Sequence, residues 1–141
     1  MQPHHTTKLV YALMSDNNFT VDVANMLLRN YYFGDDAYST LIQQHLPRVM
    51  LGRQKGHSSA VAMFARLNPH LQIGVKVNKL VHFQSMYRMY DNLHAIIDFE
   101  SEHRQYDYIV FESVGTYGIN VLDFKNALRM KKSTRIIGVG N

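Results

Sequence analysis

The spacing of hydrophobic positions along the chain changes at Pro47. Before this residue, apolar side chains recur every three or four positions, which places them along one face of a helix. They are Val21, Ala24, Leu27, Leu28 and Tyr31 in a first group and Tyr38, Leu41 and Ile42 in a second. Thr20 is a suitable N-cap for the first helix, and Asp35 or Asp36 for the second. We therefore predict a helical prefix over residues 1–47.

After Pro47, short apolar runs alternate with stretches of helical periodicity. We expect strands at 48–51, 71–77, 106–113 and 134–139, and helices at 58–67, at 83–97 and from Asn120 or Asp123 to about residue 131. Strands separated by helices require crossover connections, which make neighbouring strands parallel. The predicted fold class is therefore α/β, in three layers, with a mostly parallel sheet of about four or five strands. This core covers residues 48–141 and forms one compact domain with the helical prefix.

The composition favours a globular protein inside the cell. Hydrophobic residues make up 46% of the 141 positions and charged residues 18%, which is enough to build a core. The chain has no cysteine, which excludes disulfides, cysteine-ligated zinc and thiol catalysis. No secretory signal is recognisable, and no apolar run approaches the ~18 residues of a membrane span. We therefore expect a cytoplasmic protein without a membrane partner.

The stretch VMLGRQKGHSS, from Val49 to Ser59, has the outline of a phosphate-binding loop. Such a loop needs glycines, inward-pointing backbone N–H groups and a following helix whose positive dipole end faces the anion. Aligning it with the pattern G-x-x-x-x-G-K-[ST] on Gly56 puts His57 at the lysine position and Ser58 at the magnesium position. The candidate phosphate-binding residues are Gly52, Arg53, Gln54, Lys55, Gly56, His57, Ser58 and Ser59. The alternative is an ordinary glycine-containing turn in which Ser58 or Ser59 caps the helix.

Two further residues fit the same site. Glu112 follows the apolar run of YDYIVFES, where a strand-end carboxylate could act as the catalytic residue by holding magnesium, or its water shell, together with Ser58. Asn141 follows RIIGVG and could place a sensor-like amide at the carboxyl edge of the sheet, where ligands bind in open parallel sheets. The alternatives are a solvated strand-end carboxylate for Glu112 and a simple chain end for Asn141.

On these motifs, the chain resembles the P-loop NTPases of the additional-strand type, and among them the ATPase domains of phage terminase large subunits and helicase-like motors. The matching features are Arg53-Gln54-x-Gly56-x-Ser58 after an apolar strand, the passage RLNPHLQIGVKV, YIVFES at the Walker B place and RIIGVGN at a sensor-strand place. The resemblance covers about residues 48–141. It implies a phage-encoded domain that binds ATP or another purine nucleotide with magnesium and works in a nucleic-acid-handling assembly.

The departures from the family pattern point to weak or lost hydrolysis. His57 replaces the family's lysine, and Ser113 follows Glu112 where the family has a second carboxylate that orients the attacking water. Phosphoryl transfer depends on both charge neutralisation and positioning, so binding should survive these losses better than turnover. Arg53 or Lys55 could supply part of the missing charge. The leading hypothesis is therefore a degenerate P-loop NTPase-like protein.

A second hypothesis is a non-enzymatic interaction protein on the same scaffold, which binds a protein partner or nucleic acid. The net charge of +4 permits contact with DNA or RNA but does not require it. The densest basic segment, and the first choice for a polyanion contact, comprises Lys125, Arg129, Lys131, Lys132 and Arg135. The alternative for this segment is a solvated helix end, since cations suit a helix C-terminus.

Overall fold

The computed structural model describes residues 5–31, 34–49, 56–77, 80, 83–84, 90–112 and 118–140. Within these residues, five parallel strands form one sheet in the order β1-β5-β4-β2-β3. The strands are β1 (Arg48–Val49), β2 (Ile73–Lys76), β3 (Leu93–Ile96), β4 (Tyr108–Phe111) and β5 (Arg135–Val139). The predicted α/β class and mostly parallel sheet are confirmed.

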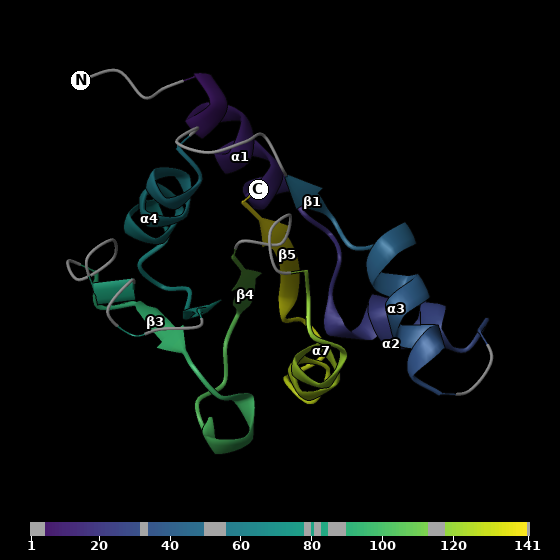
Figure 1. Cartoon of the computed structure of the whole chain (residues 1–141). Coiled ribbons are helices and arrows are strands. Elements are labelled where there is room, and N and C mark those ends of the chain that lie inside the picture. Colours follow the sequence, from purple (N-terminus) through teal and green to yellow (C-terminus); the bar gives the residue numbers. More distant parts are fainter. Residues whose placement is uncertain are drawn as a thin grey trace.

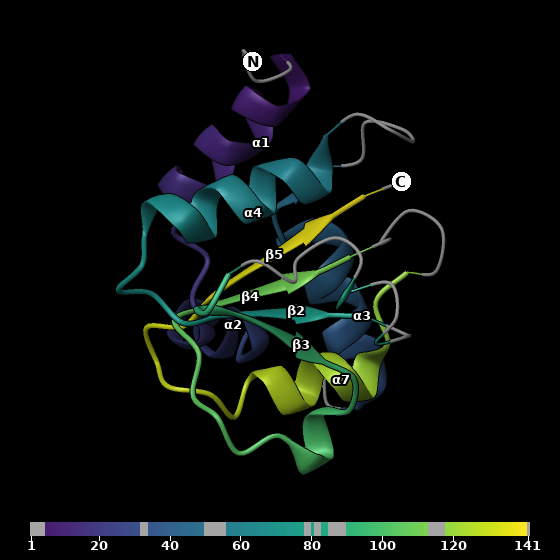
Figure 2. The ribbon, with the colours of Figure 1, turned by 90° about the vertical axis from the view of Figure 1, so that its left-hand side faces the viewer.

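Helices cover both faces of this sheet (Figures 1 and 2). One face carries α1 (His5–Asp16) and α4 (His57–Leu67). The other carries α2 (Val21–Leu28), α3 (Asp35–Gln44) and α7 (Val121–Ala127), with the short 3-10 helix η1 (Phe99–Ser101) beside α7. Central strand β4 is buried on both sides, so its side chains alternate between the two helical layers. Tyr108 and Val110 face α1 and α4, whereas Ile109 and Phe111 face the opposite layer.

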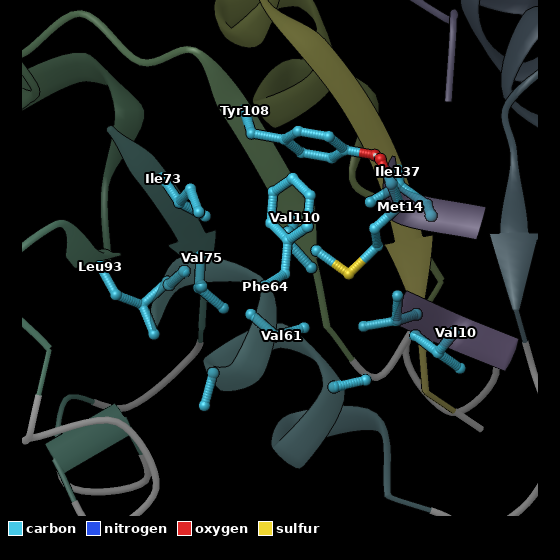
Figure 3. Packing of buried hydrophobic residues seen from close by; sticks show 14 of the residues in the cluster. Val10, Met14, Val61, Phe64, Ile73, Val75, Leu93, Tyr108, Val110 and Ile137 are labelled. Carbon is cyan, nitrogen blue, oxygen red and sulfur yellow. The ribbon is translucent and has the colours of Figure 1, made fainter. Parts of the chain in front are cut away.

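The layer formed by α1 and α4 is built around Tyr108 (Figure 3). The ring of Phe64 meets the Tyr108 ring edge to face, with 5.1 Å between centroids. The Tyr108 hydroxyl donates a hydrogen bond to the Met14 carbonyl oxygen at 2.8 Å and accepts one from Asn17 Nδ2 at 2.9 Å. The same Asn17 amide donates to the carbonyl oxygen of Ile136. This network fixes the end of α1 to strands β4 and β5.

The helical prefix packs into both layers. Helix α1, which the sequence did not predict as a separate helix, lies along α4 and contributes the buried side chains of Val10 and Met14. Helix α2 begins as predicted, with the Thr20 hydroxyl accepting a hydrogen bond from Val23 N. Backbone hydrogen bonds also join residues 19–22 to the segment around β5, among them Val21 N to Thr134 O at 2.8 Å. The prefix is therefore part of the packed core.

The structure corrects two of the expected elements. The helix predicted over 83–97 is wrong at its end, because Leu93–Ile96 form β3 and pair with β2. A short apolar run is ambiguous between helix and strand, and sheet pairing decides it here. Residues 85–89 of that prediction lie outside the described part. In α3, Gly34 is the N-cap, and Asp35 and Asp36 occupy the first helical turn instead of capping it.

Candidate functional site

The carboxyl edge of the sheet brings together two of the predicted site residues. Because the strands are parallel, the segments that leave β1 and β4 emerge at the same edge. Helix α4 carries Ser58 in its first turn, and Glu112 directly follows β4. Ser58 Oγ donates a hydrogen bond to Glu112 Oε1 at 3.4 Å, although 54 positions separate the two residues. The two residues predicted to share a magnesium ion are therefore in contact with each other.

The start of α4 is shaped by Gly56. This residue is the N-cap and adopts a left-handed conformation with φ 85°, which favours glycine. A Cβ atom at this position would lie 2.0 Å from Thr7 Oγ1, so a side chain has no room. Thr7 in turn donates a hydrogen bond from Oγ1 to the Gly56 carbonyl oxygen at 3.3 Å. With Gly56 as the N-cap, the alternative that Ser58 or Ser59 caps this helix is wrong.

His57, at the position of the family's lysine, is a buried residue that is only 9% exposed. Burial lowers the pKa of its imidazole below the ordinary value, so the ring is neutral at pH 7. Its Nε2 atom makes no hydrogen bond within the part of the chain that the structure describes. His57 therefore brings no positive charge to the start of α4.

The side-chain oxygen atoms at this edge are of the kind that magnesium prefers. Mg²⁺ prefers hard oxygen donors and usually takes one or two ligands from the protein while phosphates and waters supply the rest. The half-buried Glu112 carboxylate and the Ser58 hydroxyl are such donors. Among the residues that the structure describes, no cluster of three or more histidine and acidic side chains could hold a metal alone. The donor set thus fits magnesium bound through a nucleotide.

Lys76, a charged residue that the sequence analysis did not single out, also lies at the carboxyl edge. It ends β2, and its Nζ forms an ion pair with Asp123 Oδ2 at 3.7 Å in the first turn of α7. In the sheet register Lys76 lies opposite Phe111, whose side chain packs in the layer of α7. The contact of Glu112 with Ser58 instead lies on the α4 side. Lys76 therefore points to the opposite face of the sheet from His57, which occupies the position of the lysine in the P-loop pattern.

Five of the predicted site residues lie outside the described part of the chain. They are Gly52, Arg53, Gln54, Lys55 and Asn141. The proposed phosphate contacts of the loop, its compensating positive charge and the sensor-like amide all stay predictions.

The basic segment does not present all of its charges freely. Lys125 Nζ pairs with Asp35 Oδ1 at 3.3 Å and lies 5.2 Å from the centroid of the Tyr38 ring. Lys131 pairs with Asp107. The remaining members are Arg129 and Lys132, which are exposed, and Arg135, which is half-buried at the start of β5. Part of the positive charge expected to attract a polyanion is thus neutralised within the fold.

These features define an α/β protein with a five-stranded parallel sheet that is compatible with a P-loop NTPase-like fold. No family model matches the chain, and no curated protein matches its sequence. None of the helices in the described ranges is both long and apolar enough to span a membrane.

Proposed function

We propose that the carboxyl edge of the sheet binds a purine nucleotide with magnesium, and that the protein is a degenerate P-loop NTPase-like domain of a nucleic-acid-handling assembly. The observation that carries the proposal is the hydrogen bond between Ser58 and Glu112. In nucleotide sites of this type, a loop serine or threonine and a strand-end carboxylate hold the same magnesium ion. The two residues predicted for these roles are in contact.

The order of the strands supports the same assignment. Strand β5 lies between β1, which precedes the loop, and β4, which precedes Glu112. An extra strand between the loop strand and the acidic strand is the arrangement implied by the resemblance to additional-strand NTPases. The start of α4 also has the positive end of the helix dipole, and its N-cap glycine makes no side-chain hydrogen bond to the first turn.

The same site explains why hydrolysis should be slow. A neutral, buried His57 stands where the family's lysine would neutralise phosphate charge, and Ser113 follows Glu112 where the family has a second carboxylate. Removing one preorganised electrostatic contact costs about 10²–10³ in turnover in well-studied enzymes. The expected behaviour is therefore nucleotide binding with little or no turnover, with Arg53 or Lys55 adding positive charge in the loop.

Calorimetric titration with ATP and with ADP, each in magnesium, tests the proposal. Ser58→Ala and Glu112→Gln should each weaken binding about tenfold, which corresponds to about 1.4 kcal/mol. Matched controls are Ser39→Ala in α3 and Glu100→Gln in η1, which change the same residue types in the helical layer on the opposite face of the sheet from α4. Absence of binding by the folded wild type at millimolar nucleotide would overturn the proposal and favour the non-enzymatic interaction protein instead.

A further inference from the structure

A second concave site lies at the opposite, amino-terminal edge of the sheet. The cavity measures about 360 Å³ and is lined by residues at or near the ends of α1 and α4 and the starts of β4 and β5. These ends of the helices and strands lie at the left of Figure 2. Its polar lining comprises Ser15, Asn68, His70, Asp107, Ser133 and Arg135. Pockets that hold small ligands start at roughly 300 Å³, so the cavity could take a small molecule or part of a larger one.

The carboxylate in this lining is already neutralised. Asp107 accepts hydrogen bonds from the Gln72 backbone N–H at 2.8 Å and from the Lys131 ammonium group. Burial raises the pKa of Asp107, but these two contacts, together with the positive charges of Lys131 and His70, outweigh burial and hold the pKa below its ordinary value. Asp107 therefore stays ionised, and its negative charge is paired with the positive charge of Lys131.

Arg135 is a positively charged residue in the lining of the cavity. It is half-buried, and within the described ranges its guanidinium group forms no ion pair with a carboxylate. Its positive charge acts on the buried hydroxyl of Tyr108, where it partly opposes the rise in pKa that burial causes. A cation that has lost part of its hydration without gaining a partner is costly, and an anion in the cavity would remove that cost.

The rest of the lining offers hydrogen-bond donors to an anion. Ser15 and Ser133 contribute hydroxyl groups and His70 an imidazole. Three of the carbonyl groups near the ends of α1 and α4, which would repel an anion, already accept hydrogen bonds. Met14 O accepts from Tyr108, Phe64 O from Asn68 Nδ2 and Ala65 O from Asn92 Nδ2, all within 2.9 Å.

We propose that this cavity, named here the Arg135 cavity, binds a phosphate group through the Arg135 guanidinium and the surrounding hydroxyls. A planar guanidinium matches two phosphate oxygens at once, and this pairing is among the strongest charge-assisted hydrogen bonds. The group could belong to a small phosphorylated molecule or to the backbone of a nucleic-acid strand. The site is separate from the proposed nucleotide site, because it uses the opposite edge of the sheet and none of the same residues.

Backbone amide NMR titration of the full chain tests this site, with inorganic phosphate and a short single-stranded oligothymidylate as probes at constant ionic strength. Saturable shifts at Ser133 and Arg135 are expected, and Arg135→Gln should weaken the binding about tenfold. Arg29→Gln, an exposed arginine at the end of α2 on the other face of the sheet, is the control and should bind as the wild type does. Ser133→Asp is a second variant that should abolish binding by giving Arg135 an internal partner.

The two probes separate the possible sources of the phosphate. Tighter binding of the oligonucleotide, with steep salt dependence, assigns the cavity to nucleic acid, whereas binding of phosphate alone assigns it to a small molecule. Either result supports the proposed site if Arg135→Gln weakens it. Unsaturable shifts, or unchanged affinity in folded Arg135→Gln and Ser133→Asp, would overturn it. Ser58→Ala should leave these shifts unchanged, so the outcome is independent of the nucleotide proposal.

Discussion

Replacing Gly56 with alanine should destabilise the protein more than the same change at any open glycine. The new Cβ atom would lie 2.0 Å from Thr7 Oγ1 and 3.3 Å from Thr7 Cβ, in a backbone conformation with φ 85°. Gly118 provides a matched control, because its φ of 70° is also left-handed and nothing lies within 4 Å of a Cβ built there. The difference between the two variants therefore isolates the contact between α1 and the start of α4.

The expected loss of stability has two contributions, the left-handed backbone conformation and the close contact with Thr7. A left-handed conformation costs an alanine about 1–2 kcal/mol relative to glycine, which is the whole effect expected for Gly118→Ala. Overpacking adds about 1–3 kcal/mol at Gly56, so Gly56→Ala should lower the free energy of unfolding by about 2–5 kcal/mol. In a Thr7→Ala background the closest atom is gone, and the cost of Gly56→Ala should fall towards that of Gly118→Ala. The coupling between positions 7 and 56 should thus be about 1–3 kcal/mol.

Urea denaturation followed by far-ultraviolet circular dichroism measures these differences in a chain that has no tryptophan. The set comprises the wild type, Gly56→Ala, Thr7→Ala, their double variant and Gly118→Ala. The reasoning that α1 packs tightly against the start of α4 would be refuted if the two glycine substitutions lowered the free energy of unfolding equally. It would also be refuted if Thr7→Ala did not change the effect of Gly56→Ala.

Two further predictions concern the buried polar groups. Burial lowers the pKa of His57 in the folded protein, so the unfolded chain binds this proton at higher pH than the folded chain does. The free energy of unfolding should therefore fall as the pH is lowered from about 7 to about 5, by at most about 1.4 kcal/mol per pH unit for this group. His57→Gln should flatten this dependence of the free energy of unfolding on pH. A pH dependence that His57→Gln leaves unchanged would contradict this. Tyr108→Phe should cost about 1–3 kcal/mol in urea denaturation, because Met14 O and Asn17 Nδ2 each lose a buried partner, whereas Tyr11→Phe on the partly buried side of α1 should cost less. Equal costs for the two tyrosines would argue against the network.

Local signals were sufficient to predict most of the fold. The continuous apolar run YIVF identified the central strand, because a parallel strand that is buried on both faces needs no polar alternation. Thr20 is the N-cap of α2 as predicted, and of the two candidates Asn120 and Asp123 the structure has Asn120 as the N-cap of α7; both side chains accept hydrogen bonds from the first turns of their helices. The meeting of Ser58 and Glu112 also followed from the sequence, because parallel strands end at a common edge.

Features that depend on long-range packing were not predictable in the same way. The run at Leu93–Ile96 became a strand through pairing with β2, against a local pattern that suggested helix. The burial of His57 depends on contacts made by the whole fold, so no local sequence pattern predicts it. The sequence suggests a single basic patch, whereas in the structure Lys125 and Lys131 pair with acidic residues that lie 90 and 24 positions away along the chain. Arg135 is thereby left as the half-buried cation of a separate cavity.

The central claim is that Ser58 and Glu112 act on one magnesium-bound nucleotide, and a double-variant cycle of MgATP affinity tests it most directly. Calorimetry of the wild type, Ser58→Ala, Glu112→Gln and the double variant, with magnesium and with a chelator, gives the coupling between the two residues. With magnesium present, we predict that the loss of ATP binding free energy in the double variant is smaller than the sum of the two single losses by about 0.5–3 kcal/mol. This difference should shrink when the chelator removes the ion. Additive losses that do not depend on magnesium, or no binding of MgATP by the folded wild type, would contradict the claim.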